Sequence, residues 1–219
     1  MKTVVVVHTG PASVQPIKDQ FAEILPDVRV VNIMDDSLLN DAITAGHLTE
    51  AVTARIFTYM QLGQQMGASV LLNACSSVGE AASIARHAVS IPIVKIDDSM
   101  ASIAVDMGRR IGVVATVRTT MEPTIRLIQQ KAAQRKVQLE IVEALAEGAF
   151  EALLSGKPEV HDEIVKSRVL ALANDVDVIV LAQVSMARLV KSLGDLKVPV
   201  LSSPRSGVEA VRDILQTEV

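Results

Sequence analysis

Residues 70–77 read VLLNACSS, and residues 178–185 repeat the pattern as VIVLAQVS, 108 residues further along the chain. Each copy begins as a run of branched apolar residues and ends in small or polar ones. Such a run is typical of a strand that is buried on both faces of a parallel sheet. Cys75, the single cysteine of the chain, takes the position in the first copy that Gln183 takes in the second.

Two further pairs of segments repeat in the same order along the chain. Residues 4–10, VVVVHTG, match residues 111–117, IGVVATV, and residues 90–95, SIPIVK, match residues 197–202, KVPVLS. The spacing is 107 residues in both pairs. Three matches in one order at nearly one spacing indicate that the chain duplicates a single structural unit.

Short β-branched runs alternate with longer helical patterns along both copies. This alternation predicts an α/β fold of two pseudo-symmetric, doubly wound lobes with mostly parallel sheets. The expected strands are Thr3–Val7, Val28–Ile33, Ser69–Leu72, Ile93–Lys95, Ile111–Ala115, Gln138–Val142, Val176–Leu181 and Val198–Leu201. The expected helices are Val14–Ile24, Thr49–Met66, Val78–His87, Ser99–Arg109, Thr119–Arg135, Glu147–Leu154, Glu159–Ala173 and Ser206–Gln216.

The repeat also predicts the division of the chain. We expect lobe 1 at residues 1–97 and lobe 2 at residues 98–205, with the C-terminal helix 206–219 packing back onto lobe 1. Ligands of open α/β sheets bind beyond the carboxyl ends of the strands. A pseudo-twofold axis would therefore direct the strand ends of both lobes into one crevice, where we expect the active site. The strand-end residues are Thr9, Cys75, Thr116 and Gln183.

Composition excludes several classes of function. The net charge is −4 and aromatic residues make up 2% of the chain, so neither a cationic surface nor stacking rings indicate nucleic-acid binding. The apolar run at the N-terminus is too short for a signal peptide or a membrane span. A single cysteine cannot form an internal disulfide, which favours a reducing compartment. We therefore expect a cytoplasmic protein without a membrane partner.

No cofactor motif is present in the sequence. Neither the Gly-x-Gly-x-x-Gly dinucleotide pattern nor the phosphate-binding loop Gly-x-x-x-x-Gly-Lys-Ser/Thr occurs. The four histidines, His8, His47, His87 and His161, stand at no metal-ligand spacing, so no metal site is expected. His47, His87 and His161 are typical of surface helices or loops. The chemistry is expected to depend on side chains alone, with no cofactor.

Cys75 admits two interpretations. It stands in a loop between a strand and a helix that begins at Val78, where backbone N–H groups and the helix dipole are expected to lower the pKa of a thiol. A thiolate there could act as a base or a nucleophile. The alternative is a buried cysteine that packs as a small hydrophobe. The polar neighbours Asn73, Ser76 and Ser77 favour the functional interpretation.

Hydroxyl residues beside both strand ends are candidate substrate ligands. Ser76 and Ser77 follow Cys75 into a helix, and Thr116 and Thr119 repeat the arrangement in lobe 2, which is typical of an anion site and also of ordinary helix capping. His8 ends the first strand and could exchange a proton with a substrate or be held by structural hydrogen bonds. The aspartates Asp35, Asp36, Asp97 and Asp98 are assigned to turns and helix caps.

The ordered motifs resemble the aspartate/glutamate/hydantoin racemase superfamily. The resemblance rests on Asn73-x-Cys75-Ser76, IGVVATVRTT (111–120), DVIVLAQVSMARL (177–189) and VPVLSS (198–203), and it covers almost the whole chain. It implies two pseudo-symmetric lobes and a cofactor-independent site. Racemases of this kind use one cysteine per lobe on opposite faces of a carbon beside a carboxylate, and Cys75 matches the first of them.

Three departures from the pattern put the two-thiol route in doubt. Gln183 stands where the second cysteine belongs, and glutamine has no titratable proton at neutral pH. His8-Thr9 replaces the usual Asp-Ser or Asn-Pro step, and Cys75-Ser76-Ser77 replaces Cys-Asn-Thr. His8 could supply the second proton, and Ser185 is a weaker substitute.

The resemblance therefore implies an isomerase of the racemase or epimerase type that acts on a small carboxylate. Its catalytic residues would be Cys75, His8 and Gln183, and its substrate ligands Thr9, Ser76, Ser77, Thr116, Thr119 and Ser185. A single-cysteine decarboxylase or other lyase, a covalent cis-trans isomerase, and a non-catalytic paralogue that binds small acids also fit the pattern. A homo-oligomer is expected, because segment 49–66 is long and apolar enough to form a dimer contact.

Overall fold

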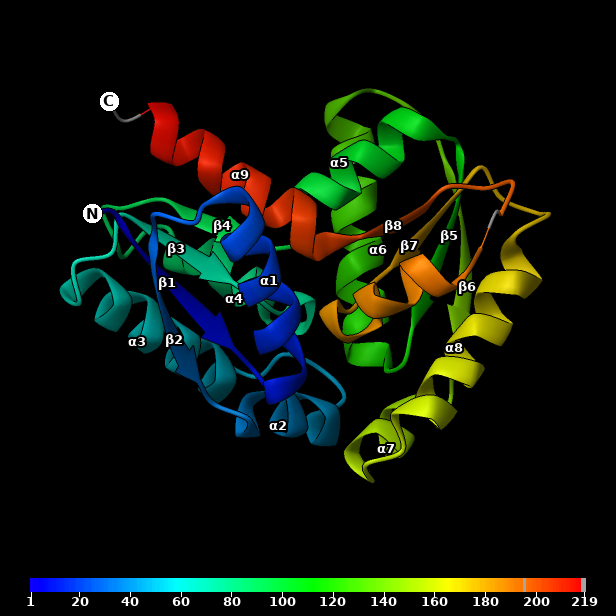
Figure 1. The fold of residues 1–219 in the computed structure, drawn as a ribbon, viewed down its shortest axis with the longest axis horizontal. Helices are drawn as coiled ribbons and strands as arrows, with labels where there is room; N and C mark the ends of the chain where they lie inside the picture. The colour runs from blue at the N-terminus through cyan, green and yellow to red at the C-terminus, as the bar shows by residue number, and fades with distance from the viewer. Residues whose placement is uncertain (195, 218–219) are drawn as a thin grey trace. The chain divides into compact units, whose positions relative to one another are not determined.

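The computed structural model describes residues 1–194 and 196–217, and the chain divides into two compact units, which we call unit 1 and unit 2. Unit 1 comprises Met1–Asp98 and Pro204–Val219, and unit 2 comprises Ser99–Ser203. Residue 195 of the expected lobe 2 and residues 218 and 219 of the expected C-terminal helix lie outside the described residues. Each unit is an α/β layer structure, as the sequence predicts (Figure 1).

Unit 1 is built on a parallel sheet that, within the described residues, has four strands in the order β2-β1-β3-β4. The strands are β1 (Thr3–His8), β2 (Arg29–Met34), β3 (Val70–Asn73) and β4 (Ile93–Lys95). The helices are α1 (Val14–Ile24), α2 (Ser37–Ala45), α3 (Glu50–Gln65), α4 (Gly79–Ala85) and α9 (Ser203–Thr217), with short 3-10 helices η1 (Pro11–Ser13) and η2 (Ser76–Val78).

The two faces of the unit 1 sheet are both covered. Val5, Val7 and Leu71 pack with α3 and α4 in one core cluster, while α1 and α9 are drawn in front of the sheet in Figure 1. Because consecutive residues of β1 point to opposite faces, a strand covered on both sides must be apolar throughout. Val4 to Val7 are accordingly fully buried, and this is why the N-terminus reads as a valine run.

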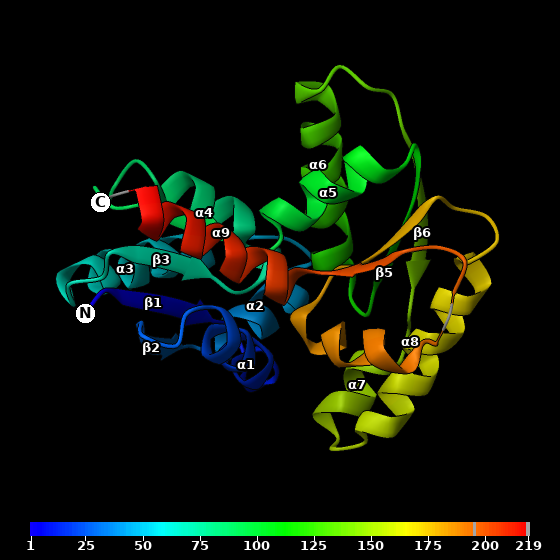
Figure 2. The ribbon, with the colours of Figure 1, turned by 45° about the horizontal axis from the view of Figure 1, so that its top comes forward.

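Unit 2 repeats this sheet with the order β6-β5-β7-β8 in the described residues. Its strands are β5 (Arg110–Ala115), β6 (Glu140–Leu145), β7 (Val178–Leu181) and β8 (Val200–Ser202). Its helices are α5 (Asp98–Met107), α6 (Arg118–Gln134), α7 (Ala149–Leu154), α8 (Pro158–Leu172) and the 3-10 helix η3 (Val184–Ser192). The helices α5 and α6 cover one face of the sheet, and α8 and η3 cover the other (Figure 2).

Most predicted elements are confirmed, but the nine-residue segments α2 and η3 are not among them. The helix α2 follows Asp35 and Asp36, for which the sequence predicts a turn, and it ends at Gly46 with φ of 74°. The 3-10 helix η3 follows Gln183. Both segments are short, so no long helical pattern of apolar residues marks them in the sequence. Burial of a few side chains, such as Leu38 and Met186, stabilises them.

The helix α9 packs closely on the end of β4 in unit 1. A Cβ atom on Gly207 would stand 2.5 Å from Ile96 Cδ1 and 2.7 Å from the Ile96 carbonyl oxygen, so only glycine permits this approach. Arg205 also forms a 2.6 Å ion pair with Glu23 of α1. These contacts attach the last helix of the chain to the end of β4 and to α1.

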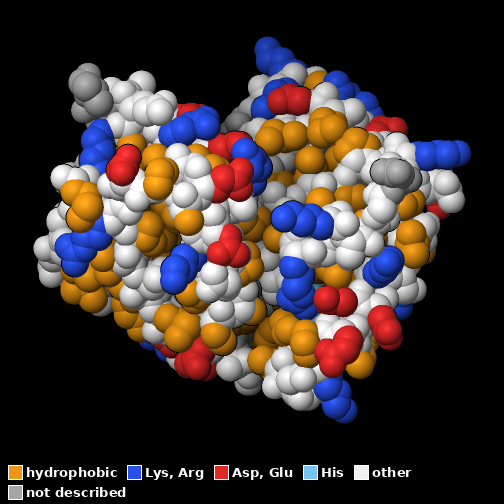
Figure 3. Space-filling view, viewed as in Figure 1, with side chains coloured by type: hydrophobic (Ala, Val, Ile, Leu, Met, Phe, Trp, Pro, Cys, Tyr) orange, Lys and Arg blue, Asp and Glu red, His pale blue; other side chains and the backbone are white. Residues whose placement is uncertain are grey.

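The surface carries mixed charges and scattered apolar side chains. Figure 3 shows hydrophobic side chains among Lys, Arg, Asp and Glu over the face of the molecule that it presents. Among the described residues, no helix has the combined length and apolar character that a membrane span requires.

Candidate active site

The first candidate site lies at the carboxyl edge of the unit 1 sheet. The strands β1 and β3 are adjacent and parallel, with Val7 opposite Asn73. Thr9 and Cys75, each two residues beyond these partners, therefore leave the sheet side by side. Thr9 is 5% exposed, and its hydroxyl forms a hydrogen bond to the Cys75 sulfur.

The turn after Cys75 supplies further donors to the same sulfur. Hydrogen bonds come from the Ser77 N–H, the Ser77 hydroxyl and the Val78 N–H. The turn is itself fixed by Asn73, whose side-chain amide donates to the Cys75 carbonyl at 2.8 Å. Cys75 is half-buried and also packs against the apolar cluster that α3 and α4 form with the sheet. Its sulfur is therefore held by polar groups from two loops.

The expected lowering of the Cys75 pKa is wrong. Burial raises the pKa of the thiol above its ordinary value, and the hydrogen bonds from Thr9, Ser77 and Val78 reduce that rise without reversing it. The sequence pattern indicates the donors correctly, but it does not show how far the sulfur is removed from water. A free thiol is therefore the main form at neutral pH.

His8 is fully buried at the end of β1, and other side chains occupy both of its ring nitrogens. Nε2 donates to Asn32 Oδ1 at 3.0 Å, and Nδ1 lies 2.7 Å from Ser13 Oγ. Burial lowers the pKa of His8, against the opposing effect of the Asn32 hydrogen bond. The imidazole is accordingly neutral at pH 7 and is engaged in contacts within unit 1.

The equivalent edge of unit 2 carries Thr116 and Gln183. Gln183 Oε1 accepts the Thr116 N–H at 2.7 Å, and Nε2 donates to the Thr116 hydroxyl oxygen at 2.7 Å. The register of β5 and β7 pairs Val114 with Leu181, so the two residues again leave the sheet side by side. Thr116 is 5% exposed and Gln183 is half-buried.

Backbone geometry supports the equivalence of Cys75 and Gln183. Each is the residue before a 3-10 helix, with φ −139° and ψ 123° at Cys75 and φ −124° and ψ 140° at Gln183. In each unit the threonine that follows the first strand is bonded to this residue. The duplicated units thus preserve a threonine-to-strand-end contact, although the partner is a sulfur in one and an amide in the other.

The remaining predicted ligands differ in their surroundings. Thr119, in the first turn of α6, has a buried hydroxyl oxygen with no hydrogen-bond partner among the described residues. The carbonyl oxygen of Ser185 accepts from Arg188 at 2.7 Å. The Ser76 hydroxyl forms a hydrogen bond to the carboxyl of Asp97, in the loop after β4.

Sequence reasoning missed two buried polar groups. Asp97, assigned to a helix cap, is 3% exposed and lies in unit 1 beside Lys95, which is 8% exposed. His161, expected on a surface, is fully buried in the first turn of α8. Its Nδ1 lies 2.7 Å from Asp162 Oδ1, and Arg188 binds the same carboxylate. Within α8, the helical stripe His161, Val165, Val169 and Leu172 was the available signal, because it places His161 on the buried face.

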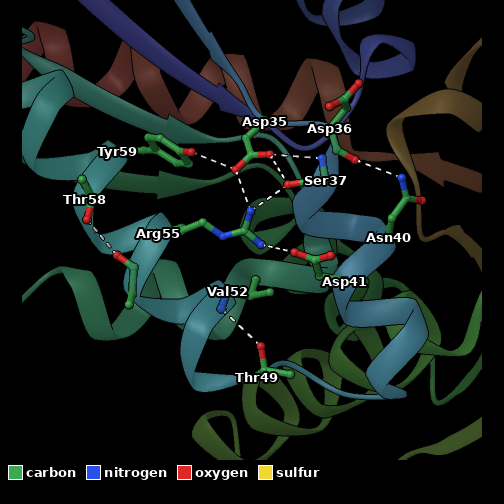
Figure 4. A network of polar contacts seen from close by, with 11 residues as sticks. Asp35, Asp36, Ser37, Asn40, Asp41, Thr49, Val52, Arg55, Thr58 and Tyr59 are labelled. Carbon is green, nitrogen blue, oxygen red and sulfur yellow. Dashed lines mark hydrogen bonds and ion pairs between the residues drawn. The ribbon is translucent and has the colours of Figure 1, made fainter.

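A polar network ties the end of β2 to α3 in unit 1 (Figure 4). Asp35 accepts from the Ser37 hydroxyl at 2.6 Å, from the Tyr59 hydroxyl at 2.8 Å and from Arg55 at 3.2 Å. Burial acts to raise the pKa of Asp35, but these hydrogen bonds and the Arg55 charge outweigh it and lower the pKa. The Asp35 N–H also donates to the His8 carbonyl at 3.1 Å, which fixes the loop at the same sheet edge as Thr9.

A separate hollow of about 640 Å³ lies between α3 and α4 of unit 1. It is lined by residues of α3, α4 and the segment before α3, namely Leu48, Glu50, Thr53, Ala54, Phe57, Thr58, Glu80 and Ile84. The predicted site residues are not part of this lining, so the hollow is distinct from the Cys75 edge.

Comparison with known proteins places the fold. A family model described as Asp/Glu/hydantoin racemase matches residues 4–211. A glutamate racemase isoform from Bacillus anthracis is similar over 99% of this chain and 82% of its own, with a TM-score of 0.78 and 20% identity. Allantoin racemase from Klebsiella pneumoniae has a TM-score of 0.74 and 17% identity over 100% of this chain and 89% of its own.

A decarboxylase has a similar fold. The Gly74Cys mutant of arylmalonate decarboxylase has a TM-score of 0.61 and 17% identity, over 99% of this chain and 94% of its own. No curated protein sequence matches the chain. At such low identities the solved structures establish the fold of two parallel-sheet units and nothing about the substrate.

Proposed function

Because the chain belongs to the Asp/Glu/hydantoin racemase family, we propose that it is a cofactor-independent isomerase of the racemase or epimerase type. The substrate would be a small amino, hydroxy or related acid. The observation that carries this proposal is the Cys75 sulfur, which is half-buried at a strand end and receives hydrogen bonds from two separate loops. A cysteine kept only for packing has no need of such donors.

In the proposed reaction the Cys75 thiolate removes a proton from the carbon beside the substrate carboxylate. The C–H bond breaks, its electron pair moves into the carboxylate as an enediolate, and the sulfur becomes a neutral thiol. A solvent water then donates a proton to the opposite face of the carbon, which inverts the centre, and the thiol returns its proton to the resulting hydroxide through solvent. Because burial favours the neutral thiol, the donors Thr9, Ser77 and Val78 serve to stabilise the thiolate during this step.

The remaining proposed residues take binding roles rather than proton transfer. His8 is neutral, with both ring nitrogens engaged, so in this proposal it holds the end of β1 and does not deliver a proton. Gln183 has no titratable proton and acts as a hydrogen-bonding group together with Thr116. Thr119 offers a hydroxyl oxygen that has no hydrogen-bond partner among the described residues. Ser185 is a further proposed substrate ligand, and Ser76, whose hydroxyl is bonded to Asp97, would take part through its backbone N–H.

The single cysteine favours a second candidate, a decarboxylase or another lyase. A lyase needs one proton delivered to one face, and one thiol is sufficient for that. The fold is shared with arylmalonate decarboxylase, which supports this candidate only at the level of architecture. One thiol is also compatible with a covalent cis-trans isomerase and with a small-acid-binding paralogue without turnover.

Solvent exchange tests the proposal directly. The protein is incubated in D₂O with a panel of small amino, hydroxy and unsaturated acids, and ¹H NMR follows loss of the proton beside the carboxylate. Exchange that disappears in Cys75→Ala and persists in Thr58→Val, a control on the exposed face of α3, supports the isomerase. Chiral chromatography then measures inversion.

Three outcomes would overturn it. Release of CO₂ with one product configuration identifies a lyase, and double-bond isomerisation without exchange identifies the covalent route. Saturable binding of an acid without exchange or turnover identifies a binding protein.

Compartment and assembly are part of the same proposal. We place the enzyme in the cytoplasm, because its single cysteine favours a reducing compartment. A homo-oligomer through α3 is supported by the exposed apolar side chains Leu62 and Met66 at the end of that helix. Light scattering of the purified chain measures the assembly state, and a monomer at micromolar concentration would contradict this part.

A further inference from the structure

Asp97 lies in the loop beside the turn that carries Cys75. It follows β4 at the carboxyl edge of the unit 1 sheet, two residues beyond Lys95, and β4 pairs Lys95 with Asn73 of β3. The loop after β4 therefore adjoins the loop after β3, in which Cys75 stands. Asp97 is 3% exposed, which is unusual for a carboxylate that stands outside an enclosed core.

The Asp97 carboxyl accepts hydrogen bonds from the Ser76 hydroxyl and from its own backbone N–H. The Lys95 ammonium attracts it, while the Asp98 charge repels it. Lys95 Nζ also lies 3.5 Å from Asp98 Oδ1. One carboxyl oxygen, Oδ1, is buried and lacks a hydrogen-bond partner among the described residues. Burial raises the pKa of Asp97 against the effects of Ser76 and Lys95.

Stability alone does not account for this cluster. Removing a carboxyl and an ammonium group from water carries a large desolvation penalty, and apolar side chains of similar size often stabilise a fold as well or better. A buried oxygen without a partner adds to the penalty. Buried titratable groups whose pKa is shifted, as that of Asp97 is, cluster at functional sites. The Asp97–Ser76 contact therefore suggests a role for Asp97 at Cys75, the residue next to Ser76.

We propose that Asp97 is a positioning residue for Cys75: by holding the Ser76 hydroxyl it fixes the turn 76–78, whose Ser77 and Val78 groups donate to the Cys75 sulfur. This inference rests on the proposed function only in taking Cys75 as the reacting group. The Lys95 charge attracts the carboxyl, and the Lys95 side chain runs past Gly79, where a Cβ would stand 3.6 Å from Lys95 Cδ.

The Cys75 sulfur has two sets of hydrogen-bond donors, which come from different loops. The Ser77 and Val78 donors depend on the turn that Asp97 holds, whereas the Thr9 hydroxyl comes from the loop after β1. Loss of Asp97 should therefore weaken the turn donors and leave the Thr9 donor in place. Fewer donors to a thiolate mean a higher thiol pKa.

The test is the pH dependence of Cys75 alkylation by iodoacetamide in the folded full-length chain, which requires no turnover. Asp97→Ala is expected to move the midpoint upward by about one pH unit, which slows alkylation at pH 8 about tenfold. Asp97→Asn retains an oxygen that can accept the Ser76 hydroxyl and should restore most of the rate. Asp41→Ala, which removes an exposed aspartate of α2 in the same unit, should leave the midpoint unchanged.

A double variant distinguishes positioning through Ser76 from a direct electrostatic effect. If Asp97 acts through Ser76, adding Asp97→Ala to Ser76→Ala produces no further shift of the midpoint. An unchanged midpoint in Asp97→Ala, or shifts that add in full, overturns the proposal. If Asp97→Ala does not fold, as judged by circular dichroism, the comparison of Ser76→Ala with Asp97→Asn decides, because the proposal requires a shift in the first and almost none in the second. Wild-type exchange that fails would refute the proposed function and leave this result standing.

Discussion

The side-chain amide of Gln183 forms two hydrogen bonds with Thr116. Oε1 accepts from the Thr116 N–H at 2.7 Å, and Nε2 donates to the Thr116 hydroxyl oxygen at 2.7 Å. Thr9 and Cys75 form the corresponding contact in unit 1. The two units therefore differ in chemistry at this position. The Cys75 thiol can gain or lose a proton, whereas the Gln183 amide can only form hydrogen bonds.

The Gln183–Thr116 contact is expected to stabilise unit 2. Gln183→Ala removes the acceptor of a nearly buried N–H, and it should lower the free energy of unfolding by about 1–3 kcal/mol. Thr116→Ser, which keeps both the hydroxyl and the N–H, should change it by well under half of that amount. Urea unfolding of the full chain measures both variants, and equal stability of Gln183→Ala and the wild type would contradict the prediction.

The Cys75 thiol should titrate above its ordinary pKa of about 8.5. Because burial favours the neutral form, alkylation by iodoacetamide should be slow at pH 7 and accelerate only at alkaline pH. Thr9→Val keeps the side-chain size but removes one donor, so it should slow alkylation at pH 8 about threefold to tenfold. The control Thr58→Val removes an exposed hydroxyl that donates to the Ala54 carbonyl, and should alkylate like the wild type. Faster reaction of Thr9→Val would show that the hydroxyl does not stabilise the thiolate.

Stability should fall in mild acid because of the two buried imidazoles. Burial lowers the pKa of His8 and of His161 in the folded state, so the unfolded chain binds more protons as the pH drops. Above about pH 6.5 both imidazoles are neutral in the folded and in the unfolded chain, so they cost no stability. As the pH falls from that value toward their lower folded pKa values, the free energy of unfolding decreases. His161→Gln should show a shallower loss of stability between pH 7 and pH 5, and His47→Gln, which changes an exposed side chain, should retain the wild-type slope. Parallel slopes in all three proteins would be inconsistent with this origin.

The same glycine substitution should have opposite effects in two helices of unit 1. At Gly207 a Cβ would stand 2.7 Å from the Ile96 carbonyl oxygen, so Gly207→Ala must displace α9 and should destabilise by about 1–3 kcal/mol. At Gly79 the nearest atom is 3.6 Å away and φ is −61°, so Gly79→Ala should be neutral or stabilising by up to about 1 kcal/mol. Thermal unfolding ranks the two variants, and a tolerated Gly207→Ala would mean that α9 does not dock this closely.

The strands of both sheets could be predicted because each is marked by a pattern of neighbouring residues in the sequence. A strand covered on both faces must be apolar at every position, and β1, β3, β5 and β7 are recognisable as such runs. The edge strand β6 is half-exposed and mixed in composition, and it begins two residues later than predicted, at Glu140. The helix α2 has nine residues and follows a turn-like Asp35-Asp36 step, so no long period indicated it.

The sequence by itself determined the two parallel-sheet units, their internal repeat and the strand-end positions of Cys75 and Gln183, because hydrophobic periodicity and residue order are properties of neighbouring positions. Only the tertiary structure decided which polar groups meet. The Ser76–Asp97 contact, the burial of His161 and the raised pKa of the Cys75 thiol depend on loops from separate strands, and on how much water those loops exclude. How much water reaches a side chain depends on segments that are distant in sequence. It therefore cannot be predicted from the residues that adjoin the side chain in the sequence.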